Sequence, residues 1–282
     1  MLTVYLKSGH VKVCRTAVPR RPRGFARIRL LCGGICNTDL ELQRGYYGFS
    51  GVPGHEFVGE VIDCDTRELV GRRVVGEINL DCGTCEWCQQ DLGRHCPRRK
   101  VLGIVKHPGV FREVFTLPER NLHVLPESLP TQVAVFTEPL AAACEILDQV
   151  KLQEGAEVAV LGDGKLGLLI AQVLNTHRMK VHLFGRHKEK LRIAARTGVV
   201  TELAVRKLPV AAYPYVVDAS GSVKGLEQAI GMTQPRGTVV MKSTVHGTVA
   251  LDTAPVIVNE ITLVGSRCGR FEPALRLLRQ GK

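Results

Sequence analysis

Four cysteines within fifteen residues constrain this chain more than any other feature of its sequence. Cys82, Cys85, Cys88 and Cys96 form two successive Cys-x-x-Cys steps, followed by a fourth cysteine eight positions later. Such a loop can bring four thiolates within about 2.3 Å of one zinc ion, and four thiolates leave no open coordination position. The spacing therefore predicts a structural zinc lobe over 82–96. Two disulfides or an iron–sulfur cluster are the alternatives.

Length and composition favour a globular chain with two domains. The 282 residues are 45% hydrophobic, which is enough for about two cores at roughly 150 residues per domain. The polar start, 1–15, predicts no secretory signal, and no apolar run reaches the roughly 18 residues that a membrane span needs. Ten cysteines in such a chain favour metal or thiol chemistry over disulfides, so we expect a cytoplasmic protein with no membrane partner.

The net charge of +11 is spread along the chain. Such a charge bears on which molecules the protein can bind and does not specify its fold. Nucleic-acid binding usually requires a basic stripe interleaved with aromatic residues, or a recognisable module, and the sequence shows neither. The sequence therefore does not favour a nucleic-acid partner, although a basic binder that uses the four-cysteine lobe as a zinc ribbon is one alternative. Part of the positive charge could also meet an anionic cofactor.

The pattern of apolar residues changes near residue 150. Before it, short Val/Ile runs such as Ala26–Leu31 and Phe57–Ile62 alternate with turn residues, which predicts a mostly-β domain over 1–150. After it, strand and helix patterns alternate, which predicts a doubly wound parallel sheet over 151–282. The expected elements of this second part are strands at Glu157–Gly162, Lys180–Phe184, Tyr215–Ala219, Thr238–Met241 and Ile261–Gly265, and helices at Lys165–Thr176 and Lys188–Thr197.

A second set of possible metal ligands lies in three separate segments. Cys36 precedes Thr38, His55 precedes Glu56, and Glu138 stands before a proline. Each is weak alone, because a lone cysteine is more often a buried small apolar residue and a lone histidine is more often part of a turn. Together, a thiolate, an imidazole and a carboxylate are a suitable zinc set with one position left for water or substrate.

A glycine-rich loop joins the expected strand 157–162 to the expected helix 165–176. Gly162, Gly164 and Gly167 form a Gly-x-Gly-x-x-Gly motif that includes Lys165 and Leu166. In this context the first glycine permits the tight turn, the second lets the backbone approach a pyrophosphate, and the third permits close helix–strand contact. The start of the helix then faces the phosphates with its positive dipole end. The motif predicts a dinucleotide site; a strand–helix turn without a ligand is the alternative.

The end of the next strand distinguishes NAD from NADP. NAD-binding proteins usually carry an acidic residue there for the ribose 2′-hydroxyl. This chain has Gly185 at that place, followed directly by Arg186, with Lys188 and Lys190 nearby. A 2′-phosphate would fit beside Arg186, so the sequence favours NADP, although Arg186 could instead stack on the adenine of NAD or face solvent. Ser220 follows another strand at the carboxyl edge, where ligands bind in such sheets.

In this order, the segments around Cys36, His55, the four-cysteine lobe, Glu138 and the glycine-rich loop resemble the zinc-containing medium-chain dehydrogenases of the alcohol dehydrogenase superfamily. The Glu-Pro-Leu that begins at Glu138 resembles the polyol, glucose and threonine dehydrogenase branch. The resemblance covers essentially the whole chain. It implies an α/β protein with a GroES-like catalytic domain and a Rossmann domain. It also implies a zinc-dependent enzyme that transfers a hydride between the CH–OH group of an alcohol or polyol and NAD(P).

The resemblance also assigns roles to residues. It implies that Cys36 and His55 bind a catalytic zinc, which with the four-cysteine lobe gives two zinc ions per chain. Either Glu56 or Glu138 would complete the ligands. Asp39 would orient the His55 ring, and Thr38 would accept the substrate hydroxyl proton.

One position departs from the family pattern. Many relatives carry a histidine, which passes the proton to solvent, where this chain has Glu41. Either Glu41 performs that relay or the proton takes a different route, and the simplest alternative for Glu41 is an exposed helix residue.

Three further expectations follow from the resemblance. Relatives continue beyond the position of Lys282 to complete the first domain, so we expect that return segment to be missing. A non-catalytic, degenerate or truncated relative that still binds zinc and nucleotide is therefore an alternative function. Relatives are usually homo-oligomers, so we expect a dimer or tetramer.

Overall fold

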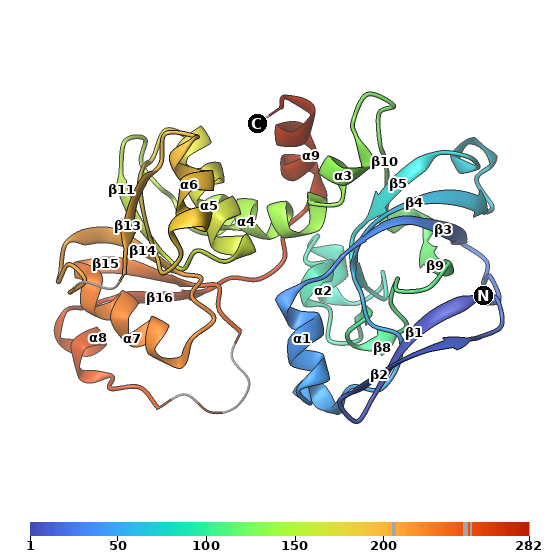
Figure 1. Ribbon diagram of the computed structural model, residues 1–282, viewed down its shortest axis with the longest axis horizontal. Helices are drawn as coiled ribbons and strands as arrows, with labels where there is room; N and C mark the ends of the chain where they lie inside the picture. Colours follow the sequence, from blue (N-terminus) through green and yellow to red (C-terminus); the bar gives the residue numbers. More distant parts are fainter. Residues whose placement is uncertain (205–206, 245–247, 249, 282) are drawn as a thin grey trace. The chain divides into compact units, whose positions relative to one another are not determined.

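The computed structural model describes residues 1–204, 207–244, 248 and 250–281 (Figure 1). The chain divides into two compact units, one formed by Met1–Glu138 with Phe271–Gly281 and the other by Pro139–Arg270. This division differs from the expected ranges 1–150 and 151–282. The first change of unit falls inside a continuous helix, α4 (Thr137–Gln149), and the chain returns to the first unit at Phe271.

The first unit contains three antiparallel or mixed sheets. Its main sheet has the strand order β10-β5-β4-β3-β9 and is antiparallel throughout, β1 pairs with β2, and β6, β7 and β8 form a small mixed sheet. The strands of this unit are β1 (Leu2–Lys7), β2 (His10–Arg15), β3 (Phe25–Gly34), β4 (Glu56–Asp63), β5 (Arg73–Gly76), β6 (Asn79–Leu80), β7 (Lys100–Leu102), β8 (Lys106–His107), β9 (Val114–Pro118) and β10 (Leu122–Val124). Its α-helices are α1 (Asn37–Gln43), α2 (Glu86–Gln89), α3 (Thr131–Ala134) and α9 (Phe271–Arg279), and its short 3-10 turns are η1 (Tyr46–Gly48), η2 (Arg67–Leu69), η3 (Gly93–His95) and η4 (Glu119–Asn121).

The core of the first unit follows from alternation along its strands. In the first half of β3, Ala26 and Ile28 are fully buried, and between them Arg27 is only partly buried. They pack with Phe57 and Phe115, whose rings meet edge to face with centroids 4.8 Å apart. Alternating side chains of one sheet thus fill a single apolar core.

The second unit is built around a six-stranded parallel sheet. The strand order is β13-β12-β11-β14-β15-β16, and every pairing is parallel. The order reverses direction between β11 and β14, which creates the switch point of a doubly wound sheet. The elements of this unit besides α4 are β11 (Glu157–Leu161), α5 (Lys165–Thr176), β12 (Lys180–Gly185), α6 (Lys188–Ala195), β13 (Val200–Leu203), β14 (Tyr213–Asp218), α7 (Val223–Met232), β15 (Thr233–Met241), α8 (Ala254–Val258) and β16 (Thr262–Gly265).

Apolar runs explain the sheet of the second unit. Val158, Ala159 and Val160 are all fully buried, as expected for a central strand that is covered on both faces. Helices α5 and α6 contact each other and follow strands on one side of the switch point, whereas α7 and α8 contact each other and follow strands on the other side (Figure 1). Right-handed crossovers place these two pairs on opposite faces. The expected α/β class is thus confirmed.

The helix α9 belongs to the first unit because its apolar side packs there. Phe271, Ala274 and Leu275 are buried, and the Phe271 ring stacks on His123 of β10 with centroids 5.6 Å apart. Across the described residues, the helices are all too short or too polar to cross a membrane.

Candidate functional site

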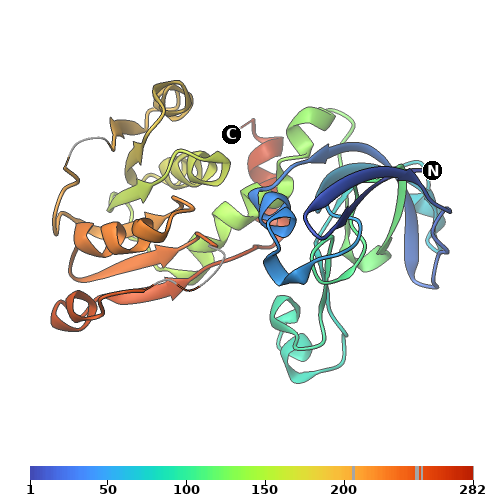
Figure 2. The same ribbon diagram turned by 60° about the horizontal axis from the view of Figure 1, so that its bottom comes forward.

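The four-cysteine lobe gathers its sulfurs at the spacing of a tetrahedral zinc site. The Sγ–Sγ distances are 3.5 Å for Cys85–Cys88, 3.7 Å for Cys85–Cys96 and 3.9 Å for Cys82–Cys88. A tetrahedron with zinc–sulfur bonds of about 2.3 Å has edges of about 3.8 Å, so the four sulfurs fit one zinc ion. Figure 2 shows this lobe extending away from the main sheet of the first unit.

Local donors favour the thiolate form of Cys82, whereas burial and the other sulfurs oppose that of Cys88. Backbone and side-chain hydrogen bonds from Thr84 lower the pKa of Cys82 to about 5, and Arg98 Nη2 lies 3.1 Å from the Cys82 sulfur. Burial and the neighbouring thiols raise the pKa of Cys88 to about 11. Four adjacent sulfurs therefore resist simultaneous deprotonation, and a bound dication would remove that resistance.

A second group of ligand atoms lies at one end of the main sheet. One ligand atom each from Cys36, His55 and Glu56 lie within 4.8 Å of one another. Cys36 directly precedes α1, and Glu56 begins β4 opposite Gly34 at the end of β3. The Glu56 carboxylate lies over Gly34, where a side chain at that position would collide with it. Strand pairing thus brings together residues that are twenty positions apart in the sequence.

Asp39 holds the Cys36 and His55 segments together. Its Oδ2 accepts the backbone N–H of Cys36 at 2.9 Å, and its Oδ1 accepts that of Gly54 at 3.1 Å. The same Oδ1 lies 3.5 Å from His55 Nδ1, which leaves Nε2 as the nitrogen that can bind a metal. Gly54 has a φ of +95°, and a Cβ there would lie 2.6 Å from the Phe111 ring, so this turn requires glycine.

The electrostatics of this group suit a cation. Burial alone would lower the pKa of His55, but the neighbouring Asp39 carboxylate and Cys36 sulfur and the charge of Glu138 raise it well above its usual value. His55 is 3% exposed, Glu56 7% and Glu138 9%. Buried carboxylates and a thiol around one imidazole are a donor set that fits zinc.

The remaining expected residues of this site lie around the three ligands. The Thr38 hydroxyl lies 3.7 Å from the Cys36 sulfur. Glu138 lies in the first turn of α4 and acts on His55 through its charge, but it is not part of the three-ligand group. Glu41 is not an exposed helix residue, since its side chain is 13% exposed and forms a 2.6 Å ion pair with Arg44.

The glycine-rich loop lies between β11 and α5, at the carboxyl edge of the parallel sheet. Gly162 has a φ of +118°, and a side chain there would collide with the backbone of Ala219. Gly167 lies against the Gly162 carbonyl, whereas Gly164 faces open space. Lys165 and Leu166 form the first turn of α5, and Lys165 is exposed. The loop therefore has the close packing and the open approach that a pyrophosphate site needs.

The other expected nucleotide contacts lie at the same edge. Arg186, Lys188 and Lys190 are exposed, at the end of β12 and on α6. The Ser220 backbone N–H donates to Asp218 Oδ1 at 3.0 Å, directly after β14. Sequence reasoning missed Asp163, a buried carboxylate inside the glycine-rich motif. The signal that could have found it is Gly185, the glycine that replaces the usual acid.

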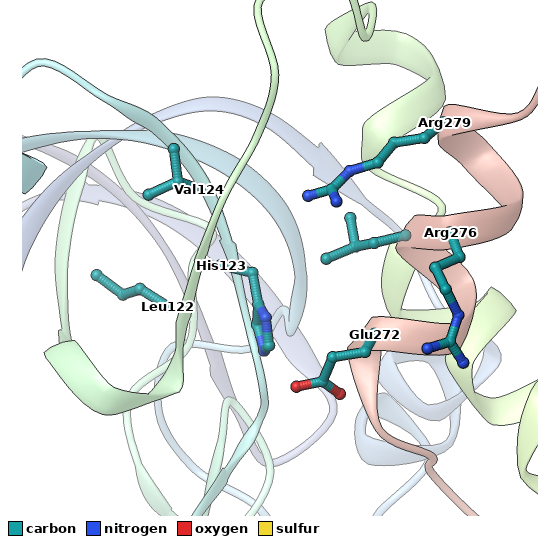
Figure 3. Close-up of a pocket in the computed structure, with 7 residues that line it drawn as sticks. Leu122, His123, Val124, Glu272, Arg276 and Arg279 are labelled. Atoms are coloured by element: carbon teal, nitrogen blue, oxygen red, sulfur yellow. The ribbon is translucent and has the colours of Figure 1, made fainter.

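A separate pocket of about 450 Å³ lies in the first unit between β10 and α9, lined by His123, Glu272, Arg276 and Arg279 among others (Figure 3). Glu77, His123 and Glu272 bring ligand atoms within 4.8 Å of one another beside it. Glu77 Oε1, however, already accepts the Phe271 N–H at 3.1 Å and lies 3.5 Å from His123 Nε2. These contacts anchor the start of α9, so we assign this group to packing.

Two protein families match the chain. Residues 22–127 match the alcohol dehydrogenase GroES-like domain, and residues 166–280 match the zinc-binding dehydrogenase family. The first match confirms the expected GroES-like part, and the second covers the glycine-rich helix and the parallel sheet that follows it.

Individual relatives resemble the chain over nearly its whole length. A sorbitol dehydrogenase of Halalkalibacterium halodurans is 28% identical, with 98% of this chain and 86% of the relative covered. A D-altritol 5-dehydrogenase of Agrobacterium fabrum is 29% identical, with 93% and 82% covered. The crystal structure of a zinc-binding dehydrogenase from Sinorhizobium meliloti 1021, bound to NADP, is 25% identical with a TM-score of 0.89, and 99% of this chain and 88% of that chain are covered.

Proposed function

This chain belongs to the zinc-containing medium-chain dehydrogenases of the alcohol dehydrogenase superfamily, and we propose that within this family it oxidises the CH–OH group of a polyol. The observation that carries the proposal is the group formed by Cys36, His55 and Glu56, which Asp39 holds in place. Sorbitol and D-altritol dehydrogenases among its relatives support a polyol as the substrate class.

The chain's own residues account for binding and proton movement. Cys36, His55 and Glu56 would hold the catalytic zinc, and the four-cysteine lobe would hold a second, structural zinc. Thr38, whose hydroxyl lies beside the Cys36 sulfur, would accept the substrate hydroxyl proton while its own proton passes to solvent. When bound, zinc supplies the positive charge that makes an alcohol easier to deprotonate, and the nicotinamide supplies the hydride acceptor.

We assign the third ligand to Glu56 in preference to Glu138. Only Glu56 lies in the group whose ligand atoms are all within 4.8 Å of one another, among the residues that the structure describes. Glu138 contributes a nearby negative charge, which stabilises a cation or a charged His55. It would thus act on the ligand and not on the metal directly.

The cofactor and the setting of the enzyme complete the proposal. Gly162, Gly164, Lys165, Leu166, Gly167 and Ser220 would bind the dinucleotide at the edge of the parallel sheet. The positive charges of Arg186 and Lys190 favour the 2′-phosphate of NADP. The negative charge of Asp163, at the same edge of the sheet, opposes it. Thiolate ligands require a reducing compartment, which supports a cytoplasmic location, and we expect a homodimer or homotetramer. The non-catalytic alternative is not favoured, because the ligand set for catalysis is retained.

The test combines metal content with activity on one sample. We expect two zinc ions per purified chain by elemental analysis, binding of a reduced nicotinamide dinucleotide, and oxidation of polyols such as sorbitol. The variant Cys36→Ser should lose one zinc ion and at least about a thousandfold in turnover, since the metal supplies several kcal/mol to the reaction. Nucleotide binding should be unchanged in that variant.

A matched control replaces a cysteine outside both groups. Cys32→Ser changes a half-buried cysteine of β3 and should leave zinc content and turnover close to those of the wild type. Full activity in Cys36→Ser, or one zinc ion per wild-type chain, would rule out the proposed catalytic centre.

A further inference from the structure

Position 185 has no side chain because another residue fills the space beside it. A Cβ built on Gly185, at the end of β12, would lie between 2.5 and 2.7 Å from the Cβ, Cγ and Oδ2 atoms of Asp163. Asp163 comes from the glycine-rich loop after β11, the strand next to β12 in the sheet. Its carboxylate therefore lies where an acidic residue at position 185 would have placed its own side chain.

The carboxylate of Asp163 is held firmly at this point. Its Oδ2 accepts the backbone N–H of Arg186 at 2.8 Å and that of His187 at 2.6 Å. The Nδ1 atom of His187 lies 3.1 Å from Oδ1 and 3.0 Å from Oδ2. Two backbone donors that precede α6 are thus already bound to an anion that belongs to the protein.

One acceptor position remains on this carboxylate. An ionised carboxylate offers about four lone-pair positions, and the two backbone donors use those of Oδ2. The His187 ring nitrogen lies within 3.1 Å of both oxygens, so Oδ2 has three nitrogen neighbours and Oδ1 has one. Oδ1 is therefore the oxygen with a lone pair left for a ligand, on a side chain that is 8% exposed. A hydroxyl group can donate to this oxygen, whereas a phosphate dianion has no proton to give.

We propose that Asp163 replaces the acidic residue that position 185 lacks. Its carboxylate accepts a hydrogen bond from the ribose 2′-hydroxyl, and this contact makes the enzyme prefer NAD to NADP. The inference rests on the proposed dinucleotide site and specifies its ligand. It departs from the sequence expectation of NADP, which rested on Gly185 in place of the usual acid and on the basic residues that follow it. A 2′-phosphate would meet a fixed negative charge and would find the N–H groups of Arg186 and His187 already occupied.

The basic side chains nearby do not reverse this preference. Arg186 and Lys190 are exposed, and an exposed ion pair changes an equilibrium constant by about fivefold or less. Asp163 is buried, so water and salt screen its charge much less than theirs. Burial alone would raise the pKa of Asp163, but hydrogen bonds from His187 and Arg186 lower it, so the carboxylate is charged at neutral pH.

The test is a fluorescence titration of the zinc-loaded full chain with NADH and with NADPH. We expect the wild type to bind NADH at least about tenfold more tightly, the effect of roughly one well-placed charge. Asp163→Asn keeps the shape and one acceptor oxygen but removes the charge, so NADPH should bind at least about tenfold more tightly than to the wild type. Adding Arg186→Ala to that variant should weaken NADPH binding.

Glu189→Gln is the matched control, because it removes one exposed negative charge from the first turn of α6. It should leave the NADH-to-NADPH ratio within about twofold of the wild type, as for a screened surface charge. A wild type that prefers NADPH overturns the inference whether or not Asp163→Asn folds. An unchanged ratio in a folded Asp163→Asn overturns it as well. Failure of the wild type to bind either nucleotide would instead reject the proposed function itself.

Discussion

At the scale of single residues, the geometry of the proposed catalytic centre depends most on Asp39. It joins the backbone before α1, the turn at Gly54 and the His55 ring through one carboxylate. Residues that orient a metal ligand in this way usually change metal affinity or activity by about 10–100-fold when they are replaced.

We therefore expect Asp39→Asn to weaken zinc binding at the Cys36 site by about 10–100-fold, because the amide keeps the shape but loses the charge. Competition with a zinc chelator, followed by elemental analysis, measures the change. Asp148→Asn, an exposed position on α4, is the control and should bind zinc like the wild type. Equal zinc affinity in Asp39→Asn and Asp148→Asn would show that Asp39 does not position His55.

A second residue-scale prediction concerns His107 on β8. Burial lowers the pKa of its ring, and the charges of Arg112 and Lys100 act in the same direction, against the hydrogen bond to the Thr116 carbonyl. The unfolded chain then binds a proton more readily than the folded one as the pH falls through about 6.5. Its contribution to stability is present above that pH and is lost as the pH falls toward the folded pKa.

Between pH 7 and pH 5, we expect the free energy of unfolding to fall more steeply for the wild type than for His107→Gln. The difference between the two slopes should be up to about 1.4 kcal/mol per pH unit. Denaturant titrations at several pH values measure this difference. The exposed His10→Gln variant should follow the wild type. Parallel pH profiles for the wild type and His107→Gln would contradict the assignment.

At the scale of elements, the four-cysteine lobe has little apart from the proposed zinc ion to hold it. Its helix α2 has four residues, none of them buried, and its Trp87 side chain is 47% exposed. Zinc binding to four thiolates contributes about 10–16 kcal/mol in small peptides, which exceeds what such a lobe could gain from packing. Metal binding and local folding of 82–96 should therefore be one event.

We expect Cys85→Ser to lose one zinc ion per chain and to expose the amides of 82–96 to rapid hydrogen exchange, while the Cys36 site keeps its zinc. Elemental analysis and hydrogen exchange by mass spectrometry measure both effects. Cys14→Ser, on β2, is the matched control and should keep both ions. Retention of amide protection in Cys85→Ser would mean that packing, not zinc, orders the lobe.

At the scale of the whole molecule, each unit carries its own ligand sites. Both proposed zinc sites lie in the first unit, and the glycine-rich loop lies in the second. Binding to the folded state alone stabilises a protein by about 2.7 kcal/mol at a ligand concentration 100 times the dissociation constant. Each ligand should therefore protect mainly the unit that binds it.

Hydrogen exchange with and without ligands tests this expectation on the full chain. NADH at saturation should slow exchange in β11, β12 and α5, and a zinc chelator should speed exchange in 82–96 and around α1. Sorbitol without nucleotide, at the same concentration, is a control for non-specific stabilisation and should leave the second unit unchanged. If NADH slowed exchange around α1 but not in β11, the proposed location of the nucleotide site would be wrong.

The sequence alone determined the features that are local along the chain. The spacing of Cys82, Cys85, Cys88 and Cys96 needs one loop only, and their sulfurs lie at the predicted separations. The helix expected at Lys165–Thr176 has those bounds, because apolar periodicity and a glycine-rich start specify it within twelve residues. The doubly wound sheet was likewise predictable from alternation of strands and helices, and family resemblance supplied Cys36 and His55.

Only the tertiary structure decided the features that depend on strand pairing and on the return of the chain to the first unit. The pairing of Gly34 with Glu56 places the Glu56 carboxylate beside Cys36, while Glu138 acts from α4, and no local pattern distinguishes these two acids. The return of α9 to the first unit depends on Phe271 packing against His123, far away in the sequence. Asp163 fills the space at Gly185 because the neighbouring strands β11 and β12 bring the two loops that follow them together. Which charged side chain lies at that place therefore depends on how the strands pair, and the order of residues along the chain does not reveal it.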